Sequence, residues 1–423
     1  MTWLAETNDN IAKGALLVES PATFSNGLFC IWLSMQRAVS GVRNAFRTFD
    51  EQKLRIDASA MSVADCFKPL ASVSTDEGRI AAFYDLAVRL RALELQFYAG
   101  IDGGPSRRSD RYKVQFDGEV AYFLHLPPRN RVAKSGDPFV RRAFERSRII
   151  PGKIGGFGVE LSTPPDPDGL ERARQKEPFK IGAGVFKDIS FTFRTTENSH
   201  FVVDGLSCDN QMETISSQIA SAAAEGCAGV IYPELTVTGE SVNSLRRSLA
   251  ANDISADGLS FVLAGSWHVE DGGVHFNESL ILGPTGAVIA SHRKLFRYTE
   301  KAKSTERIEL GEKVTVTVLG DRVISSAICL DFCNIYDNTP FDDLDVDVLL
   351  VPSCGGERTM DQHIKKAALL DARTKLQVVV VQQHYDDHAQ PNPKDLIGYV
   401  FGPGGFSDLT SSKTSEQWRV LTL

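Results

Sequence analysis

The chain has 423 residues, of which 42% are hydrophobic and 24% charged, a composition typical of a globular protein with a substantial core. Its net charge of −8 disfavours a protein whose whole surface binds nucleic acid. Its longest apolar runs, GLFCIWLSM and LQVVVVQQ, fall well short of the roughly 18–20 residues that a membrane span requires, so we expect no membrane association.

The first hundred residues are predicted to be mainly helical, most clearly over residues 74–100, STDEGRIAAFYDLAVRLRALELQFYAG. Ser74 or Thr75 can cap this helix, because a hydroxyl oxygen accepts hydrogen bonds from the free N–H groups of a first turn. Its apolar residues recur every three or four positions and form one face: Phe83, Leu86, Leu90, Leu93 and Phe97. We interpret this face as a packing surface of a helical bundle, with a partner-binding face as the alternative.

Residues 101–157 carry twice as many basic as acidic residues. Such a segment is either a solvated face or a binding surface for phosphate, nucleic acid or an acidic partner. The segment 162–178, STPPDPDGLERARQKEP, is rich in proline and charge and is the best candidate for a linker. We therefore expect two domains, a mainly helical one over residues 1–180 and a second one over residues 181–423.

After residue 180, short strands alternate with helices. The segments predicted to be strands are DISFTFR, AGVIYPEL, LSFVLAGSWH, ESLILGPTGAVIASHRKL, RVISSAICL, DVDVLLVPSC and QVVVVQQ. The segments predicted to be helices are DNQMETISSQIASAAAEGC and TMDQHIKKAALLDARTKL. This order is typical of an α/β domain in which helices cover sheets.

The cysteines indicate the compartment and the kind of site. They are seven in number and form no regular framework, which favours free thiols in a reducing cytoplasm. The start of the chain, MTWLAETNDN, lacks the basic and then apolar stretches of a signal peptide, which also favours the cytoplasm. Neither a CxxC pair nor an HExxH motif occurs, so we expect no metal and no cofactor.

Three polar residues of complementary chemistry follow predicted strands: Glu234, Lys294 and Cys329. Each alone has an ordinary explanation, because strand ends are often solvated and a lone cysteine is usually core packing. Together they would suffice for nucleophilic attack on an amide or nitrile carbon. A thiol needs help to ionise at neutral pH, a carboxylate can take its proton, and an ammonium stabilises the thiolate and a later oxyanion.

The segments around these residues resemble the nitrilase superfamily of carbon–nitrogen hydrolases. The resemblance lies in AAAEGCAGVIYPELTVTGES, FNESLILGPTGAVIASHRKLF and SSAICLDFCN, in this order and with similar separations. It continues in LLVPSC and ALLDARTKLQVVVVQQ, and it covers about residues 187–405. It implies an α-β-β-α sandwich, a fold whose members usually pair, so a homo-oligomer is expected.

The resemblance also implies roles for the three residues. Cys329 would be the nucleophile that forms a thioester or thioimidate, and Glu234 would be its general base. Lys294 would stabilise the tetrahedral intermediate, together with the backbone N–H of Leu330. The site would need no metal.

Many members of the superfamily have a second glutamate between the lysine and the cysteine. Here the candidates are Glu300, Glu306 and Glu309, and Glu306 fits best. Asp331 stands where the superfamily usually has an aspartate, and we expect it to brace the turn at the nucleophile. Asn277 matches a structural asparagine that precedes a strand.

One departure from the superfamily pattern is a second thiol, Cys333. It is either a passive apolar residue or a resolving thiol that forms a disulfide with Cys329 under oxidation. A Cys–His protease is a further alternative, in which His268, His292 or His363 would activate Cys329.

The sequence thus predicts an amidase-like hydrolase that acts on a small-molecule amide or nitrile. The alternative is a regulatory or interaction protein whose hydrolase-like domain is an effector or a pseudoenzyme. In that case the N-terminal region would bind a protein or nucleic-acid partner, and Arg141 and Arg142 would contribute to binding nucleic acid.

Overall fold

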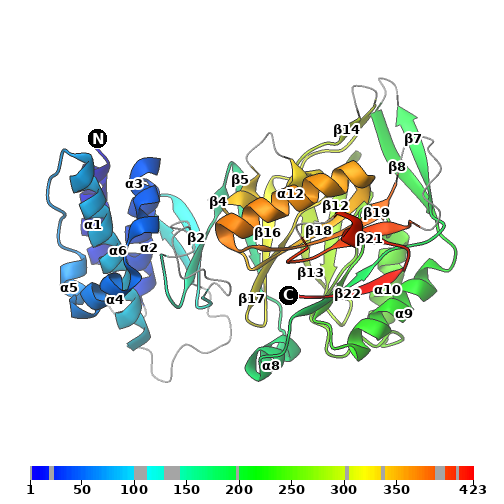
Figure 1. Ribbon diagram of the computed structural model, residues 1–423, viewed down its shortest axis with the longest axis horizontal. Coiled ribbons are helices and arrows are strands. Elements are labelled where there is room, and N and C mark those ends of the chain that lie inside the picture. The colour runs from blue at the N-terminus through cyan, green and yellow to red at the C-terminus, as the bar shows by residue number, and fades with distance from the viewer. Residues whose placement is uncertain are drawn as a thin grey trace. The chain divides into compact units, whose positions relative to one another are not determined.

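The computed structural model describes residues 2–18, 23–99, 112–127, 143–196, 200–300, 304–334, 339–385, 396–405 and 409–423. The chain folds as two units (Figure 1). One comprises Met1–Ile154 with the short pieces Asp343–Asp345 and Arg373–Lys375, and the other comprises the rest of Gly155–Leu423. No helix in the described residues is both long enough and apolar enough to cross a lipid bilayer.

The first unit combines a helical bundle with a small antiparallel sheet. Its helices are α1 (Trp3–Leu17), α2 (Phe24–Gln36), α3 (Ser40–Asn44), α4 (Glu51–Ala60), α5 (Val63–Cys66) and α6 (Asp76–Ala99). The sheet has the order β1 (Tyr112–Phe116), β2 (Glu119–Leu124), β3 (Arg148–Pro151). The prediction of a mainly helical N-terminal region is confirmed, although the small sheet was not predicted.

Helix α6 forms the centre of this unit. The hydroxyl of Thr75 accepts a hydrogen bond from the N–H of Gly78 at 3.1 Å, as expected for a cap. All five residues of the predicted apolar face are fully buried in the bundle core. The face is therefore a packing surface, and the alternative of a partner-binding face is wrong.

The second unit contains two large sheets. One has the order β21 (Lys413–Thr414), β20 (Gly398–Phe401), β19 (Gln377–His384), β18 (Val348–Gly355), β17 (Arg322–Ser326), β16 (Lys313–Leu319), β5 (Phe157–Ser162). The other has the order β11 (Trp267–Asp271), β12 (Val274–Leu282), β10 (Phe261–Leu263), β9 (Gly229–Ile231), β6 (Lys180–Gly184), β22 (Trp418–Thr422). Strand β13 (Val288–Arg293) pairs with β12.

The two sheets pack face to face, and helices cover the outside. One apolar cluster joins Ile231 and Leu263 of one sheet to Leu350 and Val379 of the other. Helices α9 (Gln211–Ala224) and α10 (Gly239–Ala250) pack on the outer face of the sheet that contains β9. Helix α12 (Glu357–Thr374) lies over the other sheet (Figure 1). The predicted α-β-β-α sandwich is therefore confirmed.

The segment before residue 180 belongs to the sandwich. Strand β5 pairs in parallel with β16, so the second unit begins at Gly155 and the boundary lies upstream of the position near residue 180 that composition suggested. The proline-rich segment contains helix α8 (Pro167–Gln175). The Asp166 carboxylate accepts from the N–H of Gly169 and caps this helix, and the proline occupies its first turn, where no N–H is needed.

A small third sheet adjoins the sandwich. It has the order β14 (Thr299–Glu300), β15 (Ser304–Glu306), β8 (His200–Ser207), β7 (Ser190–Thr196). Strands β7 and β8 form an antiparallel hairpin between β6 and α9, and β15 adds in parallel to β8. This sheet carries Glu306 at the end of β15.

Candidate active site

The three predicted catalytic residues all follow strands of the sandwich. Glu234 comes after β9 and forms an isolated bridge with Ser266. Lys294 comes directly after β13, and Cys329 lies between β17 and the short helix α11 (Leu330–Cys333). Glu234 and Lys294 are each 2% exposed and Cys329 is 7% exposed, so two opposite charges and a thiol are almost completely shielded from solvent.

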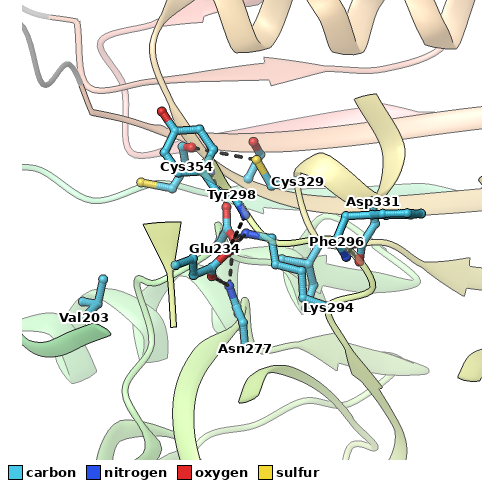
Figure 2. Close-up of polar contacts among 12 residues, drawn as sticks. Val203, Glu234, Asn277, Lys294, Phe296, Tyr298, Cys329, Asp331 and Cys354 are labelled. Atoms are coloured by element: carbon cyan, nitrogen blue, oxygen red, sulfur yellow. Dashed lines mark hydrogen bonds and ion pairs between the residues drawn. The ribbon is translucent and has the colours of Figure 1, made fainter. Parts of the chain in front are cut away.

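The charged groups form one connected network (Figure 2). The Nζ of Lys294 donates to Oε1 of Glu234 at 2.8 Å and to Oε2 of Glu306 at 2.9 Å. The Nδ2 of Asn277 donates to Oε1 of both glutamates, each at 2.9 Å. One ammonium and one amide thus hold two carboxylates, which could not lie so close together without a cation between them.

This network sets the charge states of its members. Burial alone would lower the pKa of Lys294, but the carboxylates of Glu234 and Glu306 raise it well above its ordinary value. Burial would raise the pKa of Glu306, but Lys294 and the hydrogen bond from His268 lower it well below its ordinary value. Lys294 is therefore an ammonium and Glu306 a carboxylate throughout the neutral range.

Further contacts fix the orientation of Glu306. Its Oε2 accepts from the backbone N–H of Tyr298 at 3.1 Å, and its Oε1 lies 2.9 Å from Nε2 of His268. The Nδ1 of His268 accepts from the backbone N–H of Val203 at 2.8 Å, so in neutral His268 the proton resides on Nε2 and points at Glu306.

The histidines thus have partners other than the thiol. His268 bonds to Glu306, Nε2 of His292 lies 2.9 Å from Asp331, and Nε2 of His363 lies 3.0 Å from the hydroxyl of Ser353. Among the described residues, none of the three is hydrogen-bonded to Cys329. The alternative of a Cys–His protease therefore finds no geometric support.

Cys329 stands on a sharp turn between a strand and a helix. Its backbone has φ 44° and ψ −102°, a conformation that a residue with a Cβ adopts only under constraint. Asp331 supplies part of the constraint: one oxygen accepts from the N–H groups of Leu295 and Phe296 at 2.8 and 3.0 Å, and the other from Ile328 at 3.1 Å. Asp331 thereby ties the turn at Cys329 to the segment that carries Lys294.

The same turn leaves a backbone donor beside the thiol. Leu330 is the first residue of α11, and the first N–H groups of a helix have no partner within the helix. Among the described contacts, the N–H of Leu330 has no acceptor, whereas the N–H of Cys329 donates to the carbonyl of Pro352 at 2.9 Å. Leu330 can therefore donate to a negatively charged oxygen formed near Cys329.

The backbone of Cys354, at the end of β18, contacts both the Cys329 thiol and the Glu234 carboxylate. Its N–H donates to Oε2 of Glu234 at 3.1 Å, and its carbonyl oxygen lies 4.0 Å from the sulfur of Cys329 (Figure 2). Glu234 and Cys329 thus contact the same residue. The carboxylate and the thiol therefore lie at the same end of the sandwich.

The surroundings of the Cys329 thiol disfavour its ionised form. A hydrogen bond to Cys333, burial and the negative charge of Glu234 raise the pKa of Cys329 well above its ordinary value, and Lys294 opposes this effect. All seven cysteines are free thiols. Cys333 is a free thiol in this structure, and its role as a passive residue or as a resolving thiol under oxidation stays a prediction.

The structure brings Glu306 into the network with Glu234, Lys294 and Cys329, as its selection from the sequence expects. Glu309 lies at the surface, with a side chain 57% exposed and 3.9 Å from Arg297. The side chain of Glu300 lies outside the described residues. Arg141 and Arg142, on which the nucleic-acid alternative depends, lie outside them as well.

Sequence reasoning considered His268 only as an activator of Cys329 and Asn277 only as a structural residue before a strand, and it missed their bonds to the glutamates. Asn277 lies within β12 and does not precede it. His268 and Asn277 face each other across the β11–β12 hairpin, with a turn at Gly272–Gly273. Counting outward from the glycine pair in WHVEDGGVHFN pairs His268 with Asn277, so the signal was present in the sequence. The part played by the Cys354 peptide had no such signal, because it depends on backbone atoms.

Comparison with known proteins gives structural likenesses only. No family model and no curated protein matches the chain. A solved amidase from Nesterenkonia sp. is 18% identical, with a TM-score of 0.39, over 58% of this chain and 90% of that one. A mutant of the Nesterenkonia sp. AN1 amidase that carries the acetamide moiety of fluoroacetamide on its active-site cysteine is 17% identical, with a TM-score of 0.39, over 62% and 93% of the two chains.

A further mutant of the Nesterenkonia AN1 amidase is described as being from the nitrilase superfamily. It is 18% identical to this chain, with a TM-score of 0.39, over 58% of this chain and 91% of that one.

Proposed function

We propose that the chain is a carbon–nitrogen hydrolase of the nitrilase superfamily. It would cleave a non-peptide amide, or a related bond, through a thioester on Cys329. The observation that carries the proposal is the convergence of a buried carboxylate–ammonium network on one thiol at a constrained turn. A structural ion pair needs neither the thiol nor the turn.

In the first half of the reaction, the sulfur of Cys329 attacks the carbonyl carbon while its proton passes to Glu234. The carbonyl oxygen gains the negative charge and is stabilised by the ammonium of Lys294 and the N–H of Leu330. Collapse of this intermediate breaks the carbon–nitrogen bond, and Glu234 returns the proton to the leaving nitrogen. Ammonia or an amine leaves, and a thioester remains.

In the second half, water attacks the thioester. Glu234 takes a proton from the water, and the same two donors stabilise the second oxyanion. When the carbon–sulfur bond breaks, Cys329 recovers its proton and the carboxylic acid leaves. Glu306 makes no bond to the reacting atoms in this scheme, and it holds Lys294 and Asn277 in place.

Because the pKa of Cys329 is raised, its thiol needs a base in order to attack. We propose that the proton of the thiol passes to Glu234 as the sulfur attacks the carbonyl carbon. The negative charge then develops on the carbonyl oxygen, where Lys294 and the N–H of Leu330 stabilise it. This order avoids a free buried thiolate beside the charge of Glu234.

Seven free thiols are typical of a reducing compartment, and we propose that the enzyme works in the cytoplasm. We also propose that it forms a homo-oligomer, as the resemblance to the nitrilase superfamily implies. The alternative of a nucleic-acid-associated regulator has no support among the described residues.

Release of ammonia from a panel of small amides and nitriles tests the proposed function. The wild type is compared with Cys329→Ala and with Cys208→Ala, a control that removes a half-buried thiol between β8 and α9. We expect release by the wild type and by the control, and none by Cys329→Ala. Equal release by all three proteins would contradict the proposal.

A further inference from the structure

A group of aromatic side chains adjoins the catalytic network. The rings of Phe193 and Phe201 have centroids 5.9 Å apart. The ring of Tyr385 lies 6.0 Å from that of Phe193 and 5.5 Å from that of Phe191. These four residues, Phe191, Phe193, Phe201 and Tyr385, are called the aromatic wall below.

Strand register places the wall on the same face of the third sheet as Glu306. Glu306 is the Cα partner of Phe201 across the β15–β8 pair, and partners in register project to the same side. Val203, two residues along β8, projects to that side too, and its partner in β7 is Phe193. Phe191, whose ring lies 6.2 Å from that of Phe193, continues this face. Because Glu306 points at Lys294, this face of the sheet is turned toward the catalytic network.

The other end of the wall reaches the nucleophile through the backbone. The N–H of Tyr385 donates to the carbonyl of Gly355 at 3.2 Å. Gly355 directly follows Cys354, whose peptide contacts both Glu234 and Cys329. The wall therefore adjoins the site at two independent points, through Glu306 and through Cys354.

The wall keeps apolar surface open to solvent. Phe193 is 40% exposed, and the other three side chains are only half-buried. Phenylalanine is usually buried, so the exposure of Phe193 leaves aromatic surface that a ligand can contact. Four aromatic rings offer faces and edges against which a flat apolar group can pack.

Resting on the proposed function, we propose that the substrate is an amide, or related carbon–nitrogen compound, with an aromatic or similarly flat apolar substituent that packs on the aromatic wall. The amide group reaches Cys329, while Phe193 and Phe201 contact the substituent. These two residues thereby select the substrate without taking part in bond breaking.

A matched series of amides tests this inference. Wild-type kcat/KM is measured for acetamide, phenylacetamide and N-benzylacetamide, and again for Phe193→Ala and for the more conservative Phe193→Leu. Phe179→Leu is the control, because Phe179 is a half-buried phenylalanine at the start of β6 and is not part of the wall. Thermal melting of each variant shows that it is folded.

We expect the wild type to prefer at least one aromatic amide over acetamide by about 10-fold or more, the range of selectivity that apolar contacts supply. Phe193→Ala should remove most of this preference, Phe193→Leu part of it, and Phe179→Leu none. Equal kcat/KM for all three amides would overturn the inference and leave the proposed function standing. Hydrolysis of no amide or nitrile by the folded wild type would overturn the proposed function itself.

The competing occupant of the wall is a second copy of the chain. If Phe193→Ala changes the oligomeric state in size-exclusion chromatography but leaves the preference for aromatic amides intact, the wall is an interface and the inference is wrong.

Discussion

Both units of the protein bury charge, and the contrast between them shows what distinguishes a reactive site. In the first unit, α6 buries Arg89, Arg91 and Glu94. Arg89 donates to the carbonyls of Cys66 and Lys68, and Glu94 accepts from two backbone N–H groups. Arg91 forms ion pairs with Glu51 and Glu145, so these charges tie α6 to neighbouring segments of the unit.

In the second unit, the buried charges lie around a group that can react. Glu234 and Lys294 are as deeply buried as Arg91 and Glu94, but they adjoin a thiol on a constrained turn. Buried charge alone therefore does not indicate catalysis. The indication comes from unlike titratable groups that lie around a candidate nucleophile, beside an N–H with no acceptor among the described contacts.

The largest expected effect is the loss of amide turnover in Glu234→Gln. Glu234→Gln keeps an oxygen that can accept from Lys294 and Asn277 but cannot take the proton of the thiol. We expect amide turnover to fall by about 10⁴-fold or more, with little change in melting temperature. Turnover is followed by ammonia release and stability by thermal melting. Retained turnover would show that Glu234 is structural, like Glu94.

Lys294→Met should reduce both activity and stability. It removes an oxyanion donor, which typically costs about 10²–10³-fold in kcat. It also leaves Glu234 and Glu306 facing each other without a cation, so we expect the free energy of unfolding to fall by about 3–5 kcal/mol. Denaturant unfolding measures this loss, and Lys365→Met, at a surface ion pair of α12, is the control. A Lys294→Met variant as active as wild type would remove the ammonium from the mechanism.

Glu94→Ala in α6 should show the reverse of Glu234→Gln, a loss of stability without a loss of turnover. The N–H groups of Glu145 and Arg146 lose their acceptor, which costs about 1–3 kcal/mol for buried groups. We expect a lower midpoint in denaturant, while kcat of the folded fraction stays at the wild-type value. A loss of kcat without a loss of stability would mean that the first unit takes part in the reaction.

The network also predicts how stability depends on pH. The pKa of Glu306 is lowered in the folded state, so its stabilising contribution is complete above its ordinary value of 4.5 and is lost as the pH falls below it. The pKa of Lys294 is raised, so its contribution is complete below 10.5 and is lost as the pH rises through the higher folded value. The free energy of unfolding of wild type and of Glu306→Gln, measured between pH 3 and 7, tests the contribution of Glu306. If the free energy of unfolding depends on pH in the same way in both proteins, Glu306 does not make this contribution.

The smallest expected effect concerns the thiol itself. Because the hydrogen bond to Cys333 raises the pKa of Cys329, Cys333→Ala should lower that pKa and speed alkylation of Cys329 a few-fold at pH 8–9. Peptide mapping after a short treatment with iodoacetamide measures the rate, with Cys208 as an internal reference. An unchanged or slower rate would mean that Cys333 is passive.

Much of the fold could be predicted from local patterns. The apolar run GVIYP before Glu234 predicts a strand, and β9 forms there. The spacing of Phe83, Leu86 and Leu90 predicts a helix with one buried face, and α6 has it. The segment 162–178 shows where such reasoning fails. Its prolines indicate a linker, but a proline in the first turn is compatible with a helix, and Asp166 caps α8.

The site could be predicted only as far as its motifs extend. Glu234, Lys294 and Cys329 each follow a strand in a recognisable segment, and Glu306 could be selected from three glutamates. The backbone of Cys354 and the aromatic wall could not be found, because both depend on strands that are far apart in sequence and meet only in the folded chain.

Rapid-quench mass spectrometry of the intact protein during turnover of an amide tests the central claim most directly. We predict a transient mass increase equal to the acyl group less one hydrogen, located on the peptide that contains Cys329 and absent from Cys329→Ala. Release of ammonia without this adduct, or with the adduct on another residue, would contradict the assignment of Cys329 as the nucleophile.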